Sequence, residues 1–313
     1  MPPRPSTFSI VARDPEQDAV GVAVQSKFVS VGSVVPFASA DAGAVATQSF
    51  ANVAYGPDGL ELLRQGHDAG TVVDRLTADD PEAAQRQVGV VGRDGSVAAF
   101  TGEECLDHAG DRQGETAGGW PYTVQGNILE NAATLDAMAD AFEAADGGLP
   151  ERLIAALHAG NEAGGDRRGE QSAALDVVKP EGGYDGRNDR WVDVRVDDHD
   201  APIDELERVF KLYDVTLLER APPEQVRELS GPTAEAVLEV LAELGHYDGS
   251  PGQTVGEAER DALEAFRGVQ NFENHDLEVL EDALARGWAE AEGTGEDRLV
   301  DAIWRGLSRL DRR

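Results

Sequence analysis

The chain has 313 residues, a length that suits two domains better than one. Its 60 acidic residues far outnumber its 27 basic ones, so the formal net charge is −33. Nucleic-acid binding is disfavoured, because phosphate backbones require a basic protein surface. This acidity is typical of a halophilic protein. The negative charges of such a protein repel one another, and salt screens this repulsion, with a Debye length of about 3 Å at 1 M. A dedicated cation-binding protein is the alternative, but clustered ligands are not evident, and we expect no metal and no cofactor.

Signals for membranes and secretion are also missing from the sequence. No stretch approaches the roughly 20 apolar residues of a membrane span, and residues 1–6 lack the apolar core of a secretory signal. We therefore expect a cytoplasmic protein that does not bind membranes. The single cysteine, Cys105, excludes an intrachain disulfide and a cysteine-based zinc site.

The first half of the chain reads mainly as strands. Residues 7–13 and 19–25 alternate in polarity and predict a hairpin, and residues 31–37 and 43–48 predict two more strands. Helical spacings follow from about residue 56 to residue 80. Residues 86–101 predict a hairpin around the turn at 93–95. The glycine-rich polar stretch 102–124 is interpreted as a long loop, a feature that is often functional.

The second half alternates helices with one more hairpin. Helices are expected at about 132–145 and 149–161, a hairpin at 172–179 and 190–197, and a helix from Pro202 to about 218. Hairpins separated by paired helices favour an α+β fold, here a four-layer αββα sandwich, with a single-sheet α+β domain as the alternative. We assign this domain to residues 1–218, a linker to 219–229, and a small all-helical domain to 230–313.

Seven blocks of the first domain carry a family resemblance: 7–14, 25–28, 46–49, 55–57, 125–129, 165–175 and 194–199. They resemble an uncharacterised family, domain of unknown function family 1028, which is usually grouped with the N-terminal-nucleophile (Ntn) hydrolases. The resemblance implies an Ntn-hydrolase-like αββα sandwich. Residues 230–275 resemble, more weakly, the helical peptidoglycan-binding-like module often appended to this family; the resemblance alone does not establish that ligand.

The resemblance to Ntn hydrolases implies that Thr7 is the nucleophile. In such enzymes the side chain of the first residue attacks, and its free α-amine, with a pKa near 8, acts as the base. Six residues precede Thr7, so the Ser6–Thr7 bond would have to be cleaved first. The alternative is that Thr7 is a β-branched residue at the start of a strand.

Lys27 is the second predicted catalytic residue. It is the first of only three lysines and lies at the end of the second strand of the predicted hairpin. A desolvated lysine can assist a neighbouring nucleophile. A surface lysine without a catalytic role is the equally weighted alternative.

Four further residues are candidates for substrate binding or for the oxyanion site. The side-chain amides of Gln125 and Asn127, which close the long loop, can donate to a developing oxyanion. Asp166 and Arg167 lie in a glycine-rich loop, where an arginine can hold a carboxylate or carbonyl group. Ordinary loop and capping hydrogen bonds are the alternative for all four.

Two other residues are alternative nucleophiles. Ser26 lacks an identifiable base, and Cys105 lies close to Asp107 and His108 only in sequence. The sequence thus predicts an amidohydrolase that cleaves a small amide or peptide-like bond. The competing hypothesis is a non-catalytic protein that binds a small ligand or a partner on the same fold. A homodimer formed through edge strands is a further expectation.

Overall fold

The computed structural model describes residues 7–106, 108–218 and 226–286. The chain forms two compact units, residues 1–209 and 210–313, and the boundary falls within helix α5 (Pro202–Leu217). Most of the expected linker, 219–229, lies outside the described residues, as do residues 1–6 and 287–313. Among the described residues, every helix is too short or too polar to span a lipid bilayer.

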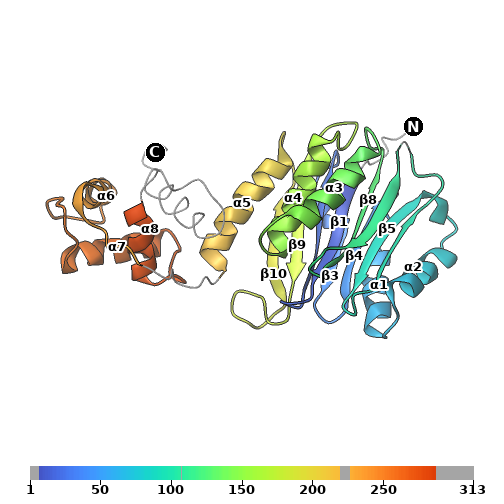
Figure 1. Ribbon diagram of the computed structural model, residues 1–313, viewed down its shortest axis with the longest axis horizontal. Coiled ribbons are helices and arrows are strands. Elements are labelled where there is room, and N and C mark those ends of the chain that lie inside the picture. The colour runs from blue at the N-terminus through green and yellow to red at the C-terminus, as the bar shows by residue number, and fades with distance from the viewer. Residues whose placement is uncertain (1–6, 107, 219–225, 287–313) are drawn as a thin grey trace. The chain divides into compact units, whose positions relative to one another are not determined.

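The first unit contains two antiparallel sheets, as the sequence predicted (Figure 1). The larger sheet has the strand order β10-β9-β2-β1-β8-β7. Its strands are β1 (Thr7–Asp14), β2 (Ala19–Ser26), β7 (Gly110–Glu115), β8 (Pro121–Asn127), β9 (Ser172–Val178) and β10 (Arg190–Val196). The smaller sheet has the order β3-β4-β5-β6, formed by β3 (Pro36–Ser39), β4 (Gly43–Ser49), β5 (Arg86–Gly92) and β6 (Val97–Thr101).

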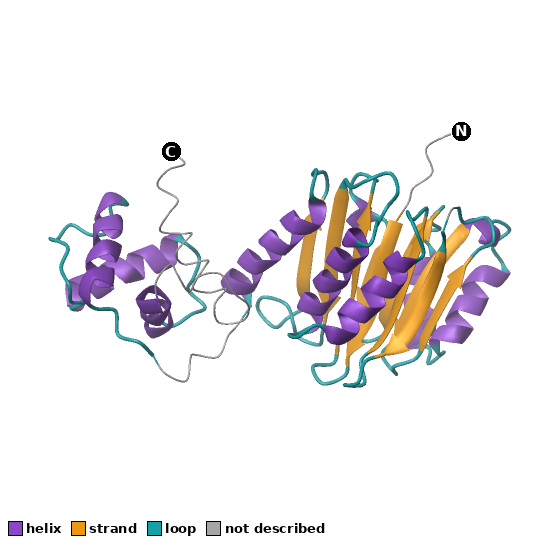
Figure 2. Ribbon diagram, turned by 45° about the horizontal axis from the view of Figure 1, so that its top comes forward, coloured by secondary structure: helices purple, strands orange, loops and turns teal. Residues whose placement is uncertain are grey.

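Each sheet carries helices on one side and contacts the other sheet with its opposite side. Helices α1 (Tyr55–Arg64) and α2 (Ala69–Ala78) pack on the smaller sheet, and α3 (Ala133–Ala144) and α4 (Leu149–Glu162) pack on the larger one. Figure 2 shows the strands lying between these two groups of helices. The expected α+β class is therefore confirmed, with antiparallel sheets and covering helices.

The pairing of β1 with β2 decides which side chains enter the space between the sheets. Thr7 lies opposite Ser26, and Phe8 lies opposite Gln25. Since side chains alternate along a strand, Phe8 packs toward α4, close to Gly160, while Thr7 and Ser9 face the smaller sheet. The period-2 pattern that predicted the hairpin also fixed this register.

Two expectations about local structure were wrong. Residues 102–124 are not one long loop, because they contain β7 and the first part of β8. Strand β7 is an edge strand of sequence GDRQGE, so it has neither a continuous apolar face nor the alternation that marks a strand. Of residues 31–37, only the end is strand, because a 3₁₀ turn (η1, Val31–Ser33) precedes β3.

The second unit has a small helical core of its own. Its helices are α6 (Gly231–Glu243), α7 (Glu257–Val269) and α8 (Leu277–Arg286). Buried side chains from all three helices pack together, among them Leu238, Leu241, Leu263, Phe266 and Leu280. The expected helical character of this part of the chain is confirmed over its described residues.

Asp176 on β9 provides a test of the packing between the sheets. Burial raises the pKa of its carboxyl group to about 6; the nearby Asp193 adds to this and Arg190 opposes it. An aspartate in an unfolded chain has a pKa of about 3.9. The folded chain therefore holds this proton more tightly, so stability from this group is present below about pH 4, falls between pH 4 and 6, and is lost above.

We expect Asp176→Asn to stabilise the first unit at pH 8 by on the order of 2 kcal/mol, and to have little effect near pH 4. Urea unfolding monitored by tryptophan fluorescence, at one fixed salt concentration, measures both values. Asp193→Asn, which removes only the neighbouring charge, should give a smaller gain at pH 8. An equal effect of Asp176→Asn at the two pH values would contradict the burial of this carboxyl group.

Candidate functional site

Thr7 opens β1 at one end of the space between the two sheets. Its side chain is buried, with 2% of the residue exposed, and its Oγ1 lies 3.1 Å from Oγ of Ser26 on β2. On the other side β1 pairs with β8, which places Asn127 opposite Thr7. The two sheet partners of Thr7 therefore add one hydroxyl group and one amide group to its surroundings.

Buried polar side chains form a hydrogen-bonded line that begins in the larger sheet. The Thr123 hydroxyl donates to Oε1 of Gln125 over 3.2 Å, and Nε2 of Gln125 donates to Oγ of Ser9 over 2.5 Å. Ser9 in turn donates across the gap to Oε1 of Gln48 on β4, at 2.6 Å. This bond joins the central strand of the larger sheet to the smaller one.

The same line continues through the smaller sheet and returns. Nε2 of Gln48 donates to Oε1 of Gln87 on β5 at 2.8 Å, and Nε2 of Gln87 donates to Oγ1 of Thr101 on β6 at 2.9 Å. Thr101 then donates to the carboxylate of Asp111 on β7, at 3.2 Å. Each hydroxyl or amide group within the line thus accepts a hydrogen bond from the preceding residue and donates one to the next. The line ends on the carboxylate of Asp111, and hydrogen bonds to a charged acceptor are stronger.

Thr7 is tied to this line through its backbone. Gln48 donates from Nε2 to the carbonyl oxygen of Thr7 at 3.3 Å. Nδ2 of Asn127 donates to the Oε1 of Gln87 that also accepts from Gln48, at 2.9 Å. Gln87 therefore sets the amide orientation of both Gln48 and Asn127.

A glycine in β5 makes room for Gln125. A Cβ atom at Gly89 would lie only 2.2 Å from Oε1 of Gln125. Glycine inside a strand usually weakens it and often marks the close approach of another group. Here it allows the Gln125 side chain to lie against the backbone of the opposite sheet.

A pocket of about 240 Å³ opens beside Thr7. Thr7 and Gln48 lie in its wall together with residues of the β2–β3 connection, the end of β4 and the start of β5: Phe28, Val31, Val34, Val35, Ser49, Phe50, Ala51 and Arg86. Ser49 has a left-handed backbone, with φ of 65°, which is uncommon for a serine and concentrates at functional sites. Thr7 therefore lies in the wall of a pocket, although only 2% of the residue is exposed.

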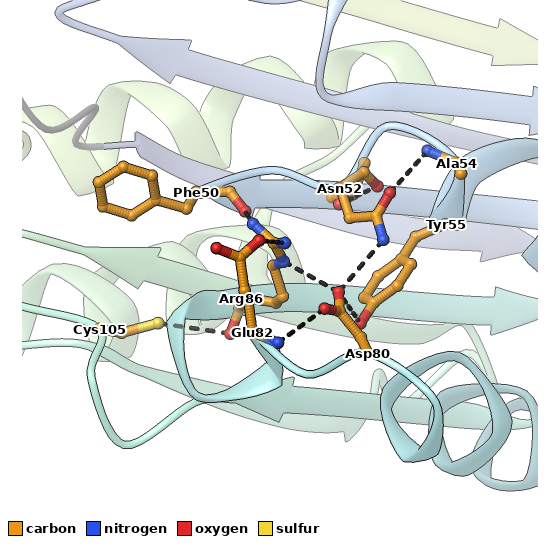
Figure 3. Close-up of polar contacts among 9 residues, drawn as sticks. Phe50, Asn52, Ala54, Tyr55, Asp80, Glu82, Arg86 and Cys105 are labelled. Carbon is orange, nitrogen blue, oxygen red and sulfur yellow. Dashed lines mark hydrogen bonds and ion pairs between the residues drawn. The ribbon is translucent and has the colours of Figure 1, made fainter.

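Arg86, in the wall of this pocket, is held by three acceptors (Figure 3). It donates to Asp80 at 3.0 Å, to Glu82 at 2.6 Å and to the carbonyl oxygen of Phe50 at 2.6 Å. The Arg86 hydrogen bond holds the pKa of the Asp80 carboxyl well below its usual range. The charge of Arg86 is therefore neutralised by carboxylates behind the pocket wall.

Asp80 also accepts hydrogen bonds from Asn52 and Tyr55, as Figure 3 shows. Burial and the Asp80 carboxylate raise the pKa of the Tyr55 hydroxyl, which stays protonated and donates. A separate, larger hollow of about 520 Å³ lies between α1 and α2 and includes these residues. The Asp80 carboxylate in this hollow already accepts hydrogen bonds from Arg86, Asn52 and Tyr55, which leaves it little capacity for a ligand.

Lys27 and Asp166, two of the predicted site residues, meet where the end of β2 contacts the loop after α4, and Arg167 lies in the same loop. Lys27 donates from its backbone nitrogen to Asp166 at 2.8 Å and from Nζ to the carbonyl oxygen of Glu170 at 2.7 Å. Asp166 also accepts from Arg168, and Arg167 lies 3.9 Å from Glu130 at the surface. These contacts fasten the 166–170 loop to the end of β2.

The remaining predicted residues lie in or near the line of hydrogen bonds. Gln125 and Asn127 belong to strand β8 and not to a loop, and both are fully buried. Cys105 lies outside the line, with its Sγ 3.4 Å from the carbonyl oxygen of Arg86, and burial raises the pKa of its thiol. A raised pKa keeps this thiol protonated, which disfavours it as a nucleophile. Asp107, once considered with it, lies outside the described residues.

Sequence reasoning missed Gln48, which donates to the carbonyl oxygen of Thr7, and Gln87, which accepts from Gln48 and Asn127. The sequence did contain a signal. A glutamine occupies an inward position near the end of strand 43–49 and another near the start of strand 86–92, and both strands are otherwise rich in small and apolar residues. No cluster of three or more potential metal-ligating side chains occurs within the described ranges. The site's own donors are hydroxyl and amide groups, which suit acyl chemistry better than metal binding.

Comparison with known proteins places both units. The model of the family of unknown function DUF1028 matches residues 7–206, and the model "Putative peptidoglycan binding domain" matches residues 216–304. The crystal structure of a DUF1028 protein from Silicibacter pomeroyi is similar to this chain, with 34% sequence identity and a TM-score of 0.59. The match covers 67% of this chain and 89% of that protein. None of the curated proteins matches. The chain therefore belongs to the family of unknown function DUF1028.

Proposed function

We propose that this protein is an Ntn-type amidohydrolase, in which Thr7 becomes the first residue and attacks a small amide or peptide-like bond. The observation that carries the proposal is the position of Thr7. It begins the first strand, its hydroxyl group contacts Ser26, and it lies in the wall of a pocket at the end of the space between two sheets. Sheets packed face to face with helices outside agree with the αββα sandwich of Ntn hydrolases.

Once the Ser6–Thr7 bond is cleaved, the chemistry needs only water and groups that this chain supplies. The Thr7 oxygen attacks the substrate carbonyl carbon, and its proton passes to the free α-amine of the same residue. The C–N bond then breaks, the leaving amine takes that proton, and the acyl group remains as an ester on Thr7. Water then attacks the acyl carbon and gives a proton to the α-amine; the ester C–O bond breaks, the amine returns that proton to the Thr7 oxygen, and the carboxylic acid is released.

Ser26 and Gln48 have different parts in the proposal. The Ser26 hydroxyl, 3.1 Å from Oγ1 of Thr7, is close enough to relay the proton or to hold the attacking oxygen. Gln48 holds the Thr7 carbonyl from the opposite sheet and acts as a positioning residue. Gln125 and Asn127 support Gln48 through Ser9 and Gln87. Lys27, Asp166 and Arg167 shape the adjacent loop.

The first prediction concerns Thr7 itself. We expect intact-mass measurement of the active protein to show a chain that begins at Thr7, and Thr7→Ala to abolish turnover of a panel of acyl p-nitroanilides at high salt. Thr7→Ser should retain part of the activity, because it keeps the hydroxyl and the amine. Thr134→Ala, which removes another buried threonine side chain, is the matched control.

Two outcomes would overturn the proposal. One is turnover by a chain that keeps residues 1–6; the other is undiminished turnover by Thr7→Ala. A full-length chain without any turnover would instead favour the non-catalytic ligand-binding protein on the same fold.

The second prediction concerns Gln48. Gln48→Met keeps the volume but removes the hydrogen bonds to Thr7, Ser9 and Gln87, so Thr7 loses its fixed position. We expect kcat to fall by about 100-fold, with a smaller change in KM, because small misplacements of a reacting group have costs of this size. Gln65→Met, at an exposed glutamine of the α1 terminus, is the control. An unchanged kcat in folded Gln48→Met would exclude the positioning role.

A further inference from the structure

The wall of the pocket beside Thr7 is mostly apolar. Six of its lining side chains are apolar: Phe28, Val31, Val34, Val35, Phe50 and Ala51. Phe28 is 40% exposed and the adjacent Val29 is 51% exposed, so apolar surface continues from the pocket to its rim. Exposed apolar surface that continues into a concavity is typical of a ligand site.

The polar groups of this wall already have partners: the Thr7 hydroxyl contacts Ser26, and Oγ of Ser49 accepts from Sγ of Cys105 at 3.6 Å. Gln48 is bonded to Ser9 and Gln87. Arg86, the one charged side chain among the lining residues that the structure describes, forms ion pairs with Asp80 and Glu82. A charged or strongly polar ligand group would lose its hydration here without gaining a partner, which is unfavourable.

The apolar wall is also held in place before any ligand arrives. Ser172 on β9 accepts from the backbone nitrogen of Val31 at 3.1 Å and donates to the carbonyl oxygen of Phe28. The backbone nitrogen of Ser30 donates to the carbonyl oxygen of Asp197 at 2.9 Å. Bonds at both ends of the 28–31 segment therefore fix the position of the apolar side chains on this side of the pocket. A preformed pocket needs little ordering when it binds.

We propose that this pocket receives an apolar, uncharged acyl group of roughly six to eight carbons, or a phenyl-bearing group of similar size. The size follows from the volume of about 240 Å³ and the roughly 30 Å³ that a water-sized group occupies in a liquid. This substrate class rests on the proposed function, because the Thr7 hydroxyl beside the pocket is the group that would meet the carbonyl of such an acyl chain.

Binding without turnover tests the inference separately from catalysis. Straight-chain primary amides from acetamide to octanamide, and phenylacetamide, are titrated by calorimetry into the full chain carrying Thr7→Ala. We expect Kd to fall about three- to fourfold for each added methylene and to level off near six to eight carbons. The monoamide of the dicarboxylic acid of equal length should bind at least tenfold more weakly. A Kd that is independent of chain length, or a preference for the charged amide, would overturn the inference.

Two variants locate the binding in this pocket. Ala51→Trp fills the volume and should weaken hexanamide binding by at least tenfold, whereas Ala144→Trp, at an exposed position of α3, should leave it unchanged. Val34→Thr alters polarity at constant size and should weaken binding several-fold, which guards against misfolding of Ala51→Trp. Equal binding by all variants would place the ligand elsewhere.

The two proposals fail in different ways. If amides bind with an affinity that rises with chain length but the unmutated protein turns none of them over, the apolar pocket is supported and the hydrolase proposal is rejected. If the protein turns over only short polar amides, the hydrolase proposal is supported and the apolar acyl-binding pocket is rejected.

Discussion

The line of hydrogen bonds that crosses twice between the two sheets is the interaction on which the site depends. Leaving one buried amide or hydroxyl group without a partner costs about 1–3 kcal/mol, so each member of the line constrains the next. Gln48 and Gln87 are satisfied only while the sheets keep their present register. The position of Thr7 is consequently set by both sheets and not by its own strand alone.

Because of this line, the side chains between the two sheets differ in polarity from one end of the strands to the other. Away from Thr7, side chains such as Val11, Val22, Val24 and Val91 form an apolar cluster. Toward Thr7 the inward strand positions carry serine, threonine, glutamine and asparagine, while Val31 and Val35 of the same apolar cluster line the pocket. An apolar packing would stabilise a purely structural sandwich at least as well, because buried polar networks contribute only when fully satisfied. Such departures from simple packing concentrate at functional sites, which supports a role for this end.

Much of the fold could be predicted because it is local. Alternation specified β1 with β2, and the Arg93-Asp94-Gly95 turn specified β5 with β6. Strand β7 could not be predicted, since an edge strand needs no apolar face. For the site, sequence placed Thr7 at the start of β1 but missed Gln48 and Gln87, because their roles arise from contacts between residues some 40 positions apart. Lys27 lies close to Thr7 in the hairpin, yet its ammonium group bonds to Glu170, which sequence spacing alone does not reveal.

The central claim is that a hydroxyl group at residue 7, fixed from both sheets, is the nucleophile of this protein. The most direct measurement is covalent labelling of the active chain with a hexyl β-lactone, which acylates a reactive hydroxyl or thiol, followed by peptide mapping. The account predicts one adduct, on the peptide that begins at Thr7, and its loss in Thr7→Ala. An adduct on Ser26 or Cys105, or none on the Thr7 peptide of a catalytically active preparation, would contradict it.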